Sequence, residues 1–148
     1  VKFITPFIHT IQSVDSMKLL VEIDKHAAKD HRVINCLLQI YIASEETKFG
    51  LSREECFEIL DNPLLQELKH VRITGLMGMA TFTADQQQVE TEFKSLKNLF
   101  DEIKKQYDLP DFETISMGMS NDYMLAIACG SNMIRVGSLL FGERNYTK

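Results

Sequence analysis

The stretch Val33-Ile-Asn-Cys-Leu-Leu-Gln-Ile-Tyr-Ile-Ala43 decides the fold, because it is nearly all apolar and polar segments bound it on both sides. A continuous apolar run of this kind is typical of a parallel strand that is buried on both faces. Parallel strands need crossover connections, which are usually helices. The sequence around this run is therefore expected to alternate strands with helices.

Four other segments also read as strands, and helical patterns separate them. The predicted strands are Phe7–Val14, Val33–Ala43, Val71–Phe82, Phe112–Met117 and Met133–Gly137. The predicted helices follow capping signals. They begin after Ser13 or Asp15, at Ser52 with Glu55 as a capping box, at Leu64 beyond Pro63, at Asp85 for a helix that reaches Tyr107, and at Ser120 for one that ends before Gly130, while Leu139–Phe141 starts another turn.

This order of elements predicts one α/β domain with a parallel sheet and right-handed crossovers. Two architectures fit: an open doubly wound sheet, or part of a (β/α)8 TIM barrel. A whole barrel needs roughly 250 residues, and the chain begins at Val1 rather than at methionine. We therefore favour a partial barrel, about strands 4 to 8, in which residues 1–148 are the C-terminal part of a single domain.

The composition is that of an ordinary globular protein, with 45% hydrophobic and 25% charged residues and a formal net charge of −5. An acidic chain without a dense basic patch is not expected to bind nucleic acid. Its apolar stretches are far shorter than the roughly 18 residues that predict a membrane span. The odd number of cysteines, Cys36, Cys56 and Cys129, predicts free thiols and a cytoplasmic location. Their spacing to the histidines predicts no zinc site.

In either architecture a ligand binds beyond the C-terminal ends of the strands. Met117-Gly-Met-Ser-Asn-Asp122 follows the fourth predicted strand. Gly118 allows a tight turn and the close approach of a ligand. Ser120 would cap the next helix, whose first backbone N–H groups form a natural anion site. The alternative interpretation is a well-capped helix without a ligand.

Arg135-Val-Gly-Ser138 follows the fifth predicted strand. The backbone N–H groups of Gly137 and Ser138 can bind a phosphate, as loops after the last barrel strands often do. Arg135 lies within an apolar strand, where it needs a carboxylate or a ligand as partner. A structural ion pair explains Arg135 equally well. Because two neighbouring strand ends both carry glycine and serine, we favour a shared phosphate site.

Two further features are less specific. The loop Glu45–Gly50 follows the second predicted strand, and its Lys48 is a candidate amine nucleophile, although a solvated loop is the simpler interpretation. Methionines gather near the strand ends and either flank a flat ring or fill the core. The sequence contains no Gly-x-Gly-x-x-Gly motif and no P-loop, so it gives no support to nucleotide binding.

Several blocks of the sequence resemble the YggS/PROSC family of pyridoxal-phosphate homeostasis proteins, in the order in which that family has them. They are Ser13–Ser16, Glu46-Thr-Lys-Phe-Gly50, Gly75-Leu-Met77, Ser116-Met-Gly-Met-Ser-Asn-Asp-Tyr123 with Ala126-Ile127, Ile134-Arg-Val-Gly-Ser138 and Phe141-Gly-Glu-Arg144. The resemblance implies a barrel like the N-terminal domain of alanine racemase, with pyridoxal 5'-phosphate (PLP) in its mouth.

The resemblance also implies a role for each candidate residue. Ser120 and the backbone around Met119 would hold the PLP phosphate, and Gly137 and Ser138 would hold it from the next loop. Arg135 would face the pyridine nitrogen, keep it unprotonated and weaken the electron sink. The Schiff-base lysine of the family lies on the first barrel strand, upstream of Val1. We therefore expect this chain to carry the phosphate half of the site without that lysine.

The function implied is PLP binding in PLP homeostasis, in the cytoplasm and without turnover, with phosphate or sulfate able to take the place of PLP. One alternative is a PLP-dependent amino-acid racemase. Another is a flavodoxin-like module that binds a phosphate ligand. The open barrel edges are expected to self-associate or to retain an N-terminal piece.

Overall fold

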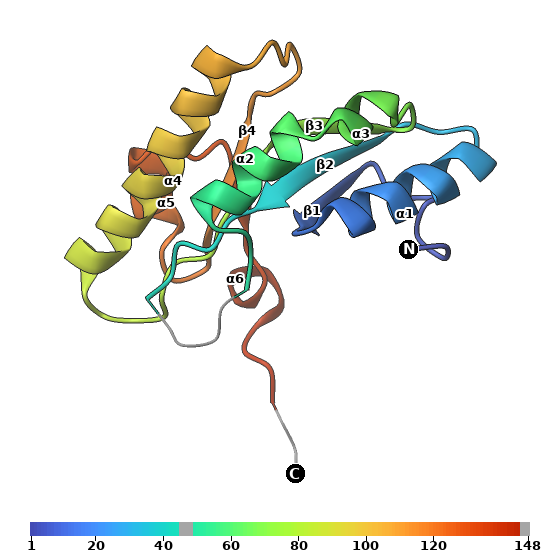
Figure 1. The fold of residues 1–148 in the computed structure, drawn as a ribbon. Helices are drawn as coiled ribbons and strands as arrows, with labels where there is room; N and C mark the ends of the chain where they lie inside the picture. The colour runs from blue at the N-terminus through green and yellow to red at the C-terminus, as the bar shows by residue number, and fades with distance from the viewer. Residues whose placement is uncertain (45–48, 146–148) are drawn as a thin grey trace.

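The computed structural model describes residues 1–44 and 49–145, in which strands alternate with helices and two helices, α2 and α3, lie between β2 and β3. The elements are β1 (Thr10–Val14), α1 (Met17–Lys29), β2 (Ile34–Gln39), α2 (Arg53–Asp61), α3 (Pro63–Glu67), β3 (Val71–Met77), α4 (Gln86–Gln106), β4 (Thr114–Met119), α5 (Tyr123–Ala128), β5 (Met133–Arg135) and α6 (Ser138–Phe141). Figure 1 shows the sheet with α1 and α2 in front of it and α6 at the lower end of the molecule.

All the strand pairs are parallel, and the strands lie in chain order, β1-β2-β3-β4-β5. A flavodoxin-like sheet has the order 2-1-3-4-5, so the open doubly wound alternative is wrong. The Ser116 hydroxyl on β4 donates to the Gln12 side chain on β1 at 2.6 Å, although β2 and β3 lie between these strands. This contact requires a curled sheet. The prediction of a partial TIM barrel is confirmed.

The hydrophobic core lies on the convex face of the sheet, under the helices. Helix α1 packs on β2 and β3, α4 packs on β3 and β4, and α5 packs on β4. Cys36 and Leu38 of β2 belong to this core. Successive side chains of a strand point to opposite faces, so Leu37 points to the concave face, where it is also fully buried. Burial on both faces explains why β2 is a continuous apolar run.

The helices begin where their sequences provide a cap. The predicted capping box of Ser52 and Glu55 is confirmed at the start of α2, and Asp85 caps α4. The cap of α1 is Ser16, whose Oγ accepts from the Leu19 N–H at 3.1 Å, rather than the predicted Ser13 or Asp15. Several consecutive residues here are good N-caps, and the end of β1 at Val14 decides between them.

Four predicted strands are longer than the observed ones. Strand β2 spans Ile34–Gln39 instead of Val33–Ala43. Phe7 lies in a turn in which its N–H donates to the Ile4 carbonyl, so β1 begins only at Thr10. Strand β3 ends at Met77 and β5 at Arg135, five and two residues before the predicted ends. Beyond Met77 the backbone turns to side-chain partners, as at Thr81, whose N–H donates to Glu92. Apolar composition alone did not predict where these strands begin and end.

Candidate phosphate site at the strand ends

The loops that follow β4 and β5 meet at the Ser120 hydroxyl. Its Oγ accepts from the Gly137 N–H at 3.2 Å and from the Leu139 N–H at 3.4 Å. The structure therefore brings Ser120 and Gly137 together, as the two Gly/Ser strand ends led us to expect. Two backbone N–H groups that converge on one oxygen atom form an arrangement that can also bind an anion oxygen.

Ser120 does not cap α5, contrary to the prediction. The N-cap is Asp122, and α5 begins at Tyr123. The Asp122 carboxylate instead accepts from the Met119 N–H at 2.7 Å, which closes the turn from Met119 to Asp122. This turn leaves Ser120 free to face α6. It also means that the Met119 amide is already paired with a carboxylate.

The two glycines of the site have different roles. A Cβ on Gly118, at φ +104, would lie 2.7 Å from the Ala126 Cβ and 3.0 Å from the Tyr123 Cα. Gly118 therefore lets α5 pack closely on β4. It also lines the cavity at the strand ends, so the approach of a ligand at that position stays a prediction. Next to Gly137, in contrast, a Cβ would meet no atom within 4 Å. The open space of the site lies at Gly137.

Arg135 ties together the ends of three strands. Its Nη1 donates to the Ser116 Oγ at 2.6 Å and to the Ser116 carbonyl at 3.2 Å, and its Nη2 donates to the Gly78 carbonyl at 3.1 Å. The expected partner was a carboxylate or a ligand, but these partners are neutral oxygens. The Gly78 carbonyl, just beyond β3, and the Ser116 carbonyl, within β4, thus help to solvate the guanidinium.

The charge of Arg135 is half-buried. Burial lowers the pKa of its guanidinium, and the negative charge of Asp122 opposes this shift. Arginine remains protonated at any physiological pH. Its three hydrogen bonds engage three of the five N–H groups that a guanidinium carries. The mouth of the sheet thus contains a fixed positive charge two residues before Gly137.

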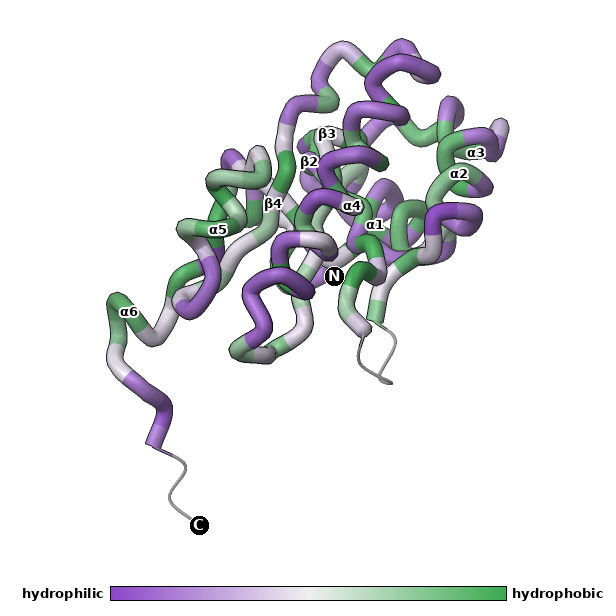
Figure 2. Tube along the Cα trace, turned by 90° about the vertical axis from the view of Figure 1, so that its left-hand side faces the viewer, coloured by the Kyte–Doolittle hydropathy of each residue, from purple (hydrophilic) through white to green (hydrophobic). Residues whose placement is uncertain are grey.

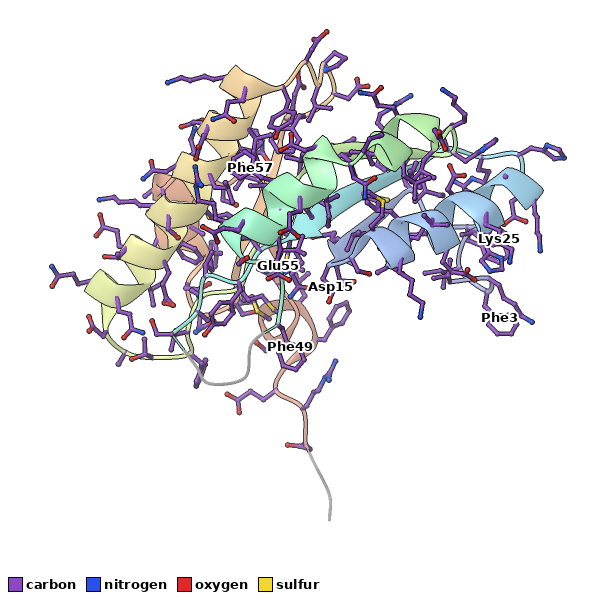
Figure 3. All side chains as sticks on the ribbon, in the orientation of Figure 1. Phe3, Asp15, Lys25, Phe49, Glu55 and Phe57 are labelled. Carbon is purple, nitrogen blue, oxygen red and sulfur yellow. The ribbon has the colours of Figure 1, made fainter. Side chains whose placement is uncertain are left out.

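A cavity of about 240 Å³ opens beside this site, at the C-terminal ends of β2, β3 and β4. Met79 and Met119 line it, whereas Met117 is fully buried in the core, so the methionines near the strand ends divide between the two predicted roles. Phe49 also lines the cavity and lies at the same end of the molecule as α6 (Figures 1 and 3). Apolar side chains around a small cavity suit a flat ring.

Sequence reasoning missed two parts of the site. Asp122 closes the turn before α5, and the Ser-Asn-Asp sequence offers several caps among which a local pattern cannot choose. The Gln12–Ser116 contact joins residues that are 104 positions apart, for which no local signal exists. The candidate nucleophile Lys48 lies outside the described residues. In the part of the chain that the structure describes, no cluster of histidine, cysteine or acidic residues could hold a metal ion, and no helix combines the length and hydrophobicity of a membrane span.

Residues 6–145 match the alanine racemase N-terminal domain family, and the chain belongs to it. The pyridoxal phosphate homeostasis protein of Helicobacter pylori strain 26695 is 41% identical over 133 residues, which are 90% of this chain and 57% of that protein. The protein of the same name from Aquifex aeolicus is 36% identical over 146 residues, 99% of this chain and 63% of that protein. These relatives confirm the resemblance predicted from the sequence blocks. The chain spans about three fifths of their length.

Solved structures show the same fold. PipY of Synechococcus elongatus PCC7942 with PLP bound is 30% identical and has a TM-score of 0.82, over 95% of this chain and 64% of PipY. The alanine racemase of Clostridium difficile 630 is 17% identical with a TM-score of 0.70, over 97% of this chain and 40% of the racemase. The second likeness concerns the fold alone. Both support the assignment of the curled sheet to a racemase-type barrel.

Proposed function

We propose that this chain provides the phosphate-binding loops of a PLP-binding protein that serves PLP homeostasis. The observation that carries the proposal is the convergence of the Gly137 and Leu139 N–H groups on the Ser120 hydroxyl at the strand ends. The curated relatives are pyridoxal phosphate homeostasis proteins, and PipY has been solved with PLP bound. What these related proteins are named for supports the proposal.

The residues present fit a phosphate group. Gly137 leaves open space where any side chain would intrude, and Ser138 is exposed at the start of α6. We assign the phosphate to Ser120, Gly137 and Ser138. The Met119 amide is held by Asp122, so Met119 contributes its exposed side chain to the wall of the neighbouring cavity.

Arg135 is assigned to the pyridine nitrogen through the N–H groups that its bonds to Ser116 and Gly78 leave over. PLP supplies an aldehyde and an electron-withdrawing ring when it is bound. A permanently protonated guanidinium cannot accept a proton, so it disfavours the protonated ring and weakens that withdrawal. The curated relatives are named as homeostasis proteins rather than as enzymes, and on that ground we propose that the protein is not an enzyme.

The location and the assembly of the protein are part of the proposal. Cys36, Cys56 and Cys129 are free thiols, as predicted, which suits the reducing cytoplasm. Strands β1 and β5 are the edges of the sheet. Three apolar residues of α6 stand in solvent, and Figure 2 shows this helix away from the body of the molecule. We propose that copies of the chain associate through these edges and α6, since apolar patches of this kind are typical of interfaces.

The test is a calorimetric titration of the 148-residue chain with PLP, repeated in the presence of inorganic phosphate. We expect PLP to bind saturably and inorganic phosphate to compete with it. Ser120→Ala, which removes one hydroxyl, should bind PLP more weakly. Thr91→Val is the control, because the exposed Thr91 hydroxyl donates only to the Gln87 carbonyl on the surface of α4. Binding that is insensitive to both phosphate and Ser120→Ala would contradict the assignment. Racemisation of alanine by the full-length protein would favour the enzyme alternative.

A further inference from the structure

A buried carboxylate outside the phosphate site deserves explanation. Glu92 lies on α4 among apolar core residues and is only 6% exposed. Its Oε1 accepts from the Thr81 N–H at 2.9 Å and from the Thr81 hydroxyl at 2.6 Å. Its Oε2 is buried and has no hydrogen-bond partner among the described residues. Such a group destabilises the fold unless its bonds compensate for the loss of hydration.

The bonds of Glu92 continue to a second loop. The Thr81 Oγ1 that donates to Glu92 also accepts from the Ser44 N–H at 2.9 Å. Ser44 follows β2 and Thr81 follows β3, so the two segments are 37 positions apart in the chain. Glu92 therefore holds the Thr81 loop directly, and it holds the segment after β2 through the Thr81 hydroxyl.

These two segments lie side by side after neighbouring strands, and both contribute to the lining of the cavity at the mouth. Ala43, which precedes Ser44, lines it from the β2 side. Ala80 and Phe82, which flank Thr81, line it from the β3 side. The positions of these two segments are thus linked by two hydrogen bonds in series that end on Glu92 in the helix layer.

We propose that Glu92 is a positioning residue for ligand binding, which holds two loops that line the mouth cavity in place through Thr81 and Ser44. An apolar residue at this position would continue the stripe of Val89, Phe93 and Leu96, and it would avoid the cost of burying a polar group. Glu92 is nevertheless present, and its Oε2 is buried without a hydrogen-bond partner among the described residues. The hydrogen bonds made by Oε1 then explain why a glutamate occupies this position, since they order the loops that line the cavity. The inference deepens the proposed function, because it concerns the cavity that would receive the ring.

The first experiment needs no ligand. Amide hydrogen exchange of Ser44 and Thr81 is measured in Thr81→Val, which is nearly isosteric and removes only the hydroxyl, and in Glu92→Leu. Loss of one net hydrogen bond predicts exchange at Ser44 that is roughly fivefold faster in both variants. Only Glu92→Leu should accelerate Thr81. Thr81→Ser retains the hydroxyl and should restore the slow exchange. Unchanged exchange at Ser44 in folded Thr81→Val would overturn the proposal.

The second experiment compares two ligands. Thr81→Val and Glu92→Leu should weaken PLP roughly threefold to tenfold, as expected for members of one hydrogen-bond network. They should leave inorganic phosphate unchanged, because Ser120 and Gly137 do not take part in the network. Glu90→Gln is the control, since Glu90 forms a surface ion pair with Lys94 on the same helix. Unaltered PLP affinity in Thr81→Val would refute a positioning role.

The two experiments separate this inference from the proposed function. If the unmodified chain bound neither PLP nor phosphate, the phosphate site would be refuted, and the exchange data would still decide whether Glu92 controls the loops. A lower melting temperature of Glu92→Leu with unchanged exchange at Ser44 would assign Glu92 to helix packing alone.

Discussion

Replacing Arg135 by alanine is the perturbation that best separates ligand binding from support of the fold. The substitution removes the hydrogen bonds from the guanidinium to the two Ser116 oxygens and to the Gly78 carbonyl. No carboxylate takes part in these bonds, so the cost of about 3–5 kcal/mol for breaking a buried ion pair does not apply. The question is how much stability three bonds to neutral oxygens supply from a half-buried side chain.

The magnitude follows from these contacts. A hydrogen bond to a charged group contributes about 1.5–3 kcal/mol when it is well buried. Part of this is offset here by the desolvation of the guanidinium, which also lowers its pKa. We therefore expect Arg135→Ala to lower the free energy of unfolding by roughly 2 kcal/mol in total. For a chain of this size the melting temperature should fall by about 4–8 °C.

The same variant should bind PLP about tenfold to a hundredfold more weakly, because it loses one charged hydrogen bond to the ring. The assay measures the melting temperature of the ligand-free protein by circular dichroism and the PLP affinity of the folded variant by calorimetry. Arg72→Ala is the control, since Arg72 pairs with Asp111 on the surface, where both side chains are more than half exposed. This control should change stability by less than about 1 kcal/mol.

The refuting result is clear. A large fall in melting temperature with normal PLP affinity would make Arg135 purely structural and would remove its role at the ring nitrogen. Unchanged values of both quantities would show that the three hydrogen bonds of the guanidinium contribute nothing measurable.

Three other predictions follow from the structure. Gly137→Ala should fold normally, because a Cβ meets nothing within 4 Å, yet it should weaken phosphate binding in a titration; unchanged affinity would place the anion elsewhere. Burial raises the pKa of the Cys36 and Cys56 thiols from 9.0 to about 12. Their neutral forms therefore favour the folded state fully below pH 9, and this stability is lost as the pH rises toward 12, by up to about 1.4 kcal/mol per pH unit for each thiol. Urea unfolding at about pH 8 and about pH 10 tests this, with the Cys36→Ala/Cys56→Ala variant expected to lose less between the two. Light scattering should give a mass above 17.0 kDa, and Phe141→Asp should reduce it; a monomer at all concentrations would argue against self-association.

The sequence by itself determined the class of the fold and which two loops meet at the candidate site. The apolar run of β2, the capping box of Ser52 and Glu55 and the long amphipathic α4 depend on neighbours within about four positions, so they can be read without coordinates. The ends of parallel strands gather at one edge of a sheet, so Ser120 and Gly137 could be placed together from their positions after β4 and β5. The family followed from blocks of residues that remain in order along the chain.

Only the tertiary structure decided which groups touch. The curl of the sheet brings Gln12 to Ser116 across 104 positions, and it brings Arg135 to the Gly78 carbonyl across 57. Sequence reasoning correctly required a partner for Arg135, and a ligand partner stays a prediction. It did not foresee the Ser116 and Gly78 carbonyls, because backbone acceptors leave no trace in side-chain patterns. For the same reason the sequence did not predict a role for Glu92. A carboxylate within an apolar stripe is unremarkable until the crossover that follows β3 places the Thr81 loop on it, since long-range contacts depend on how the crossovers close and local patterns do not record that.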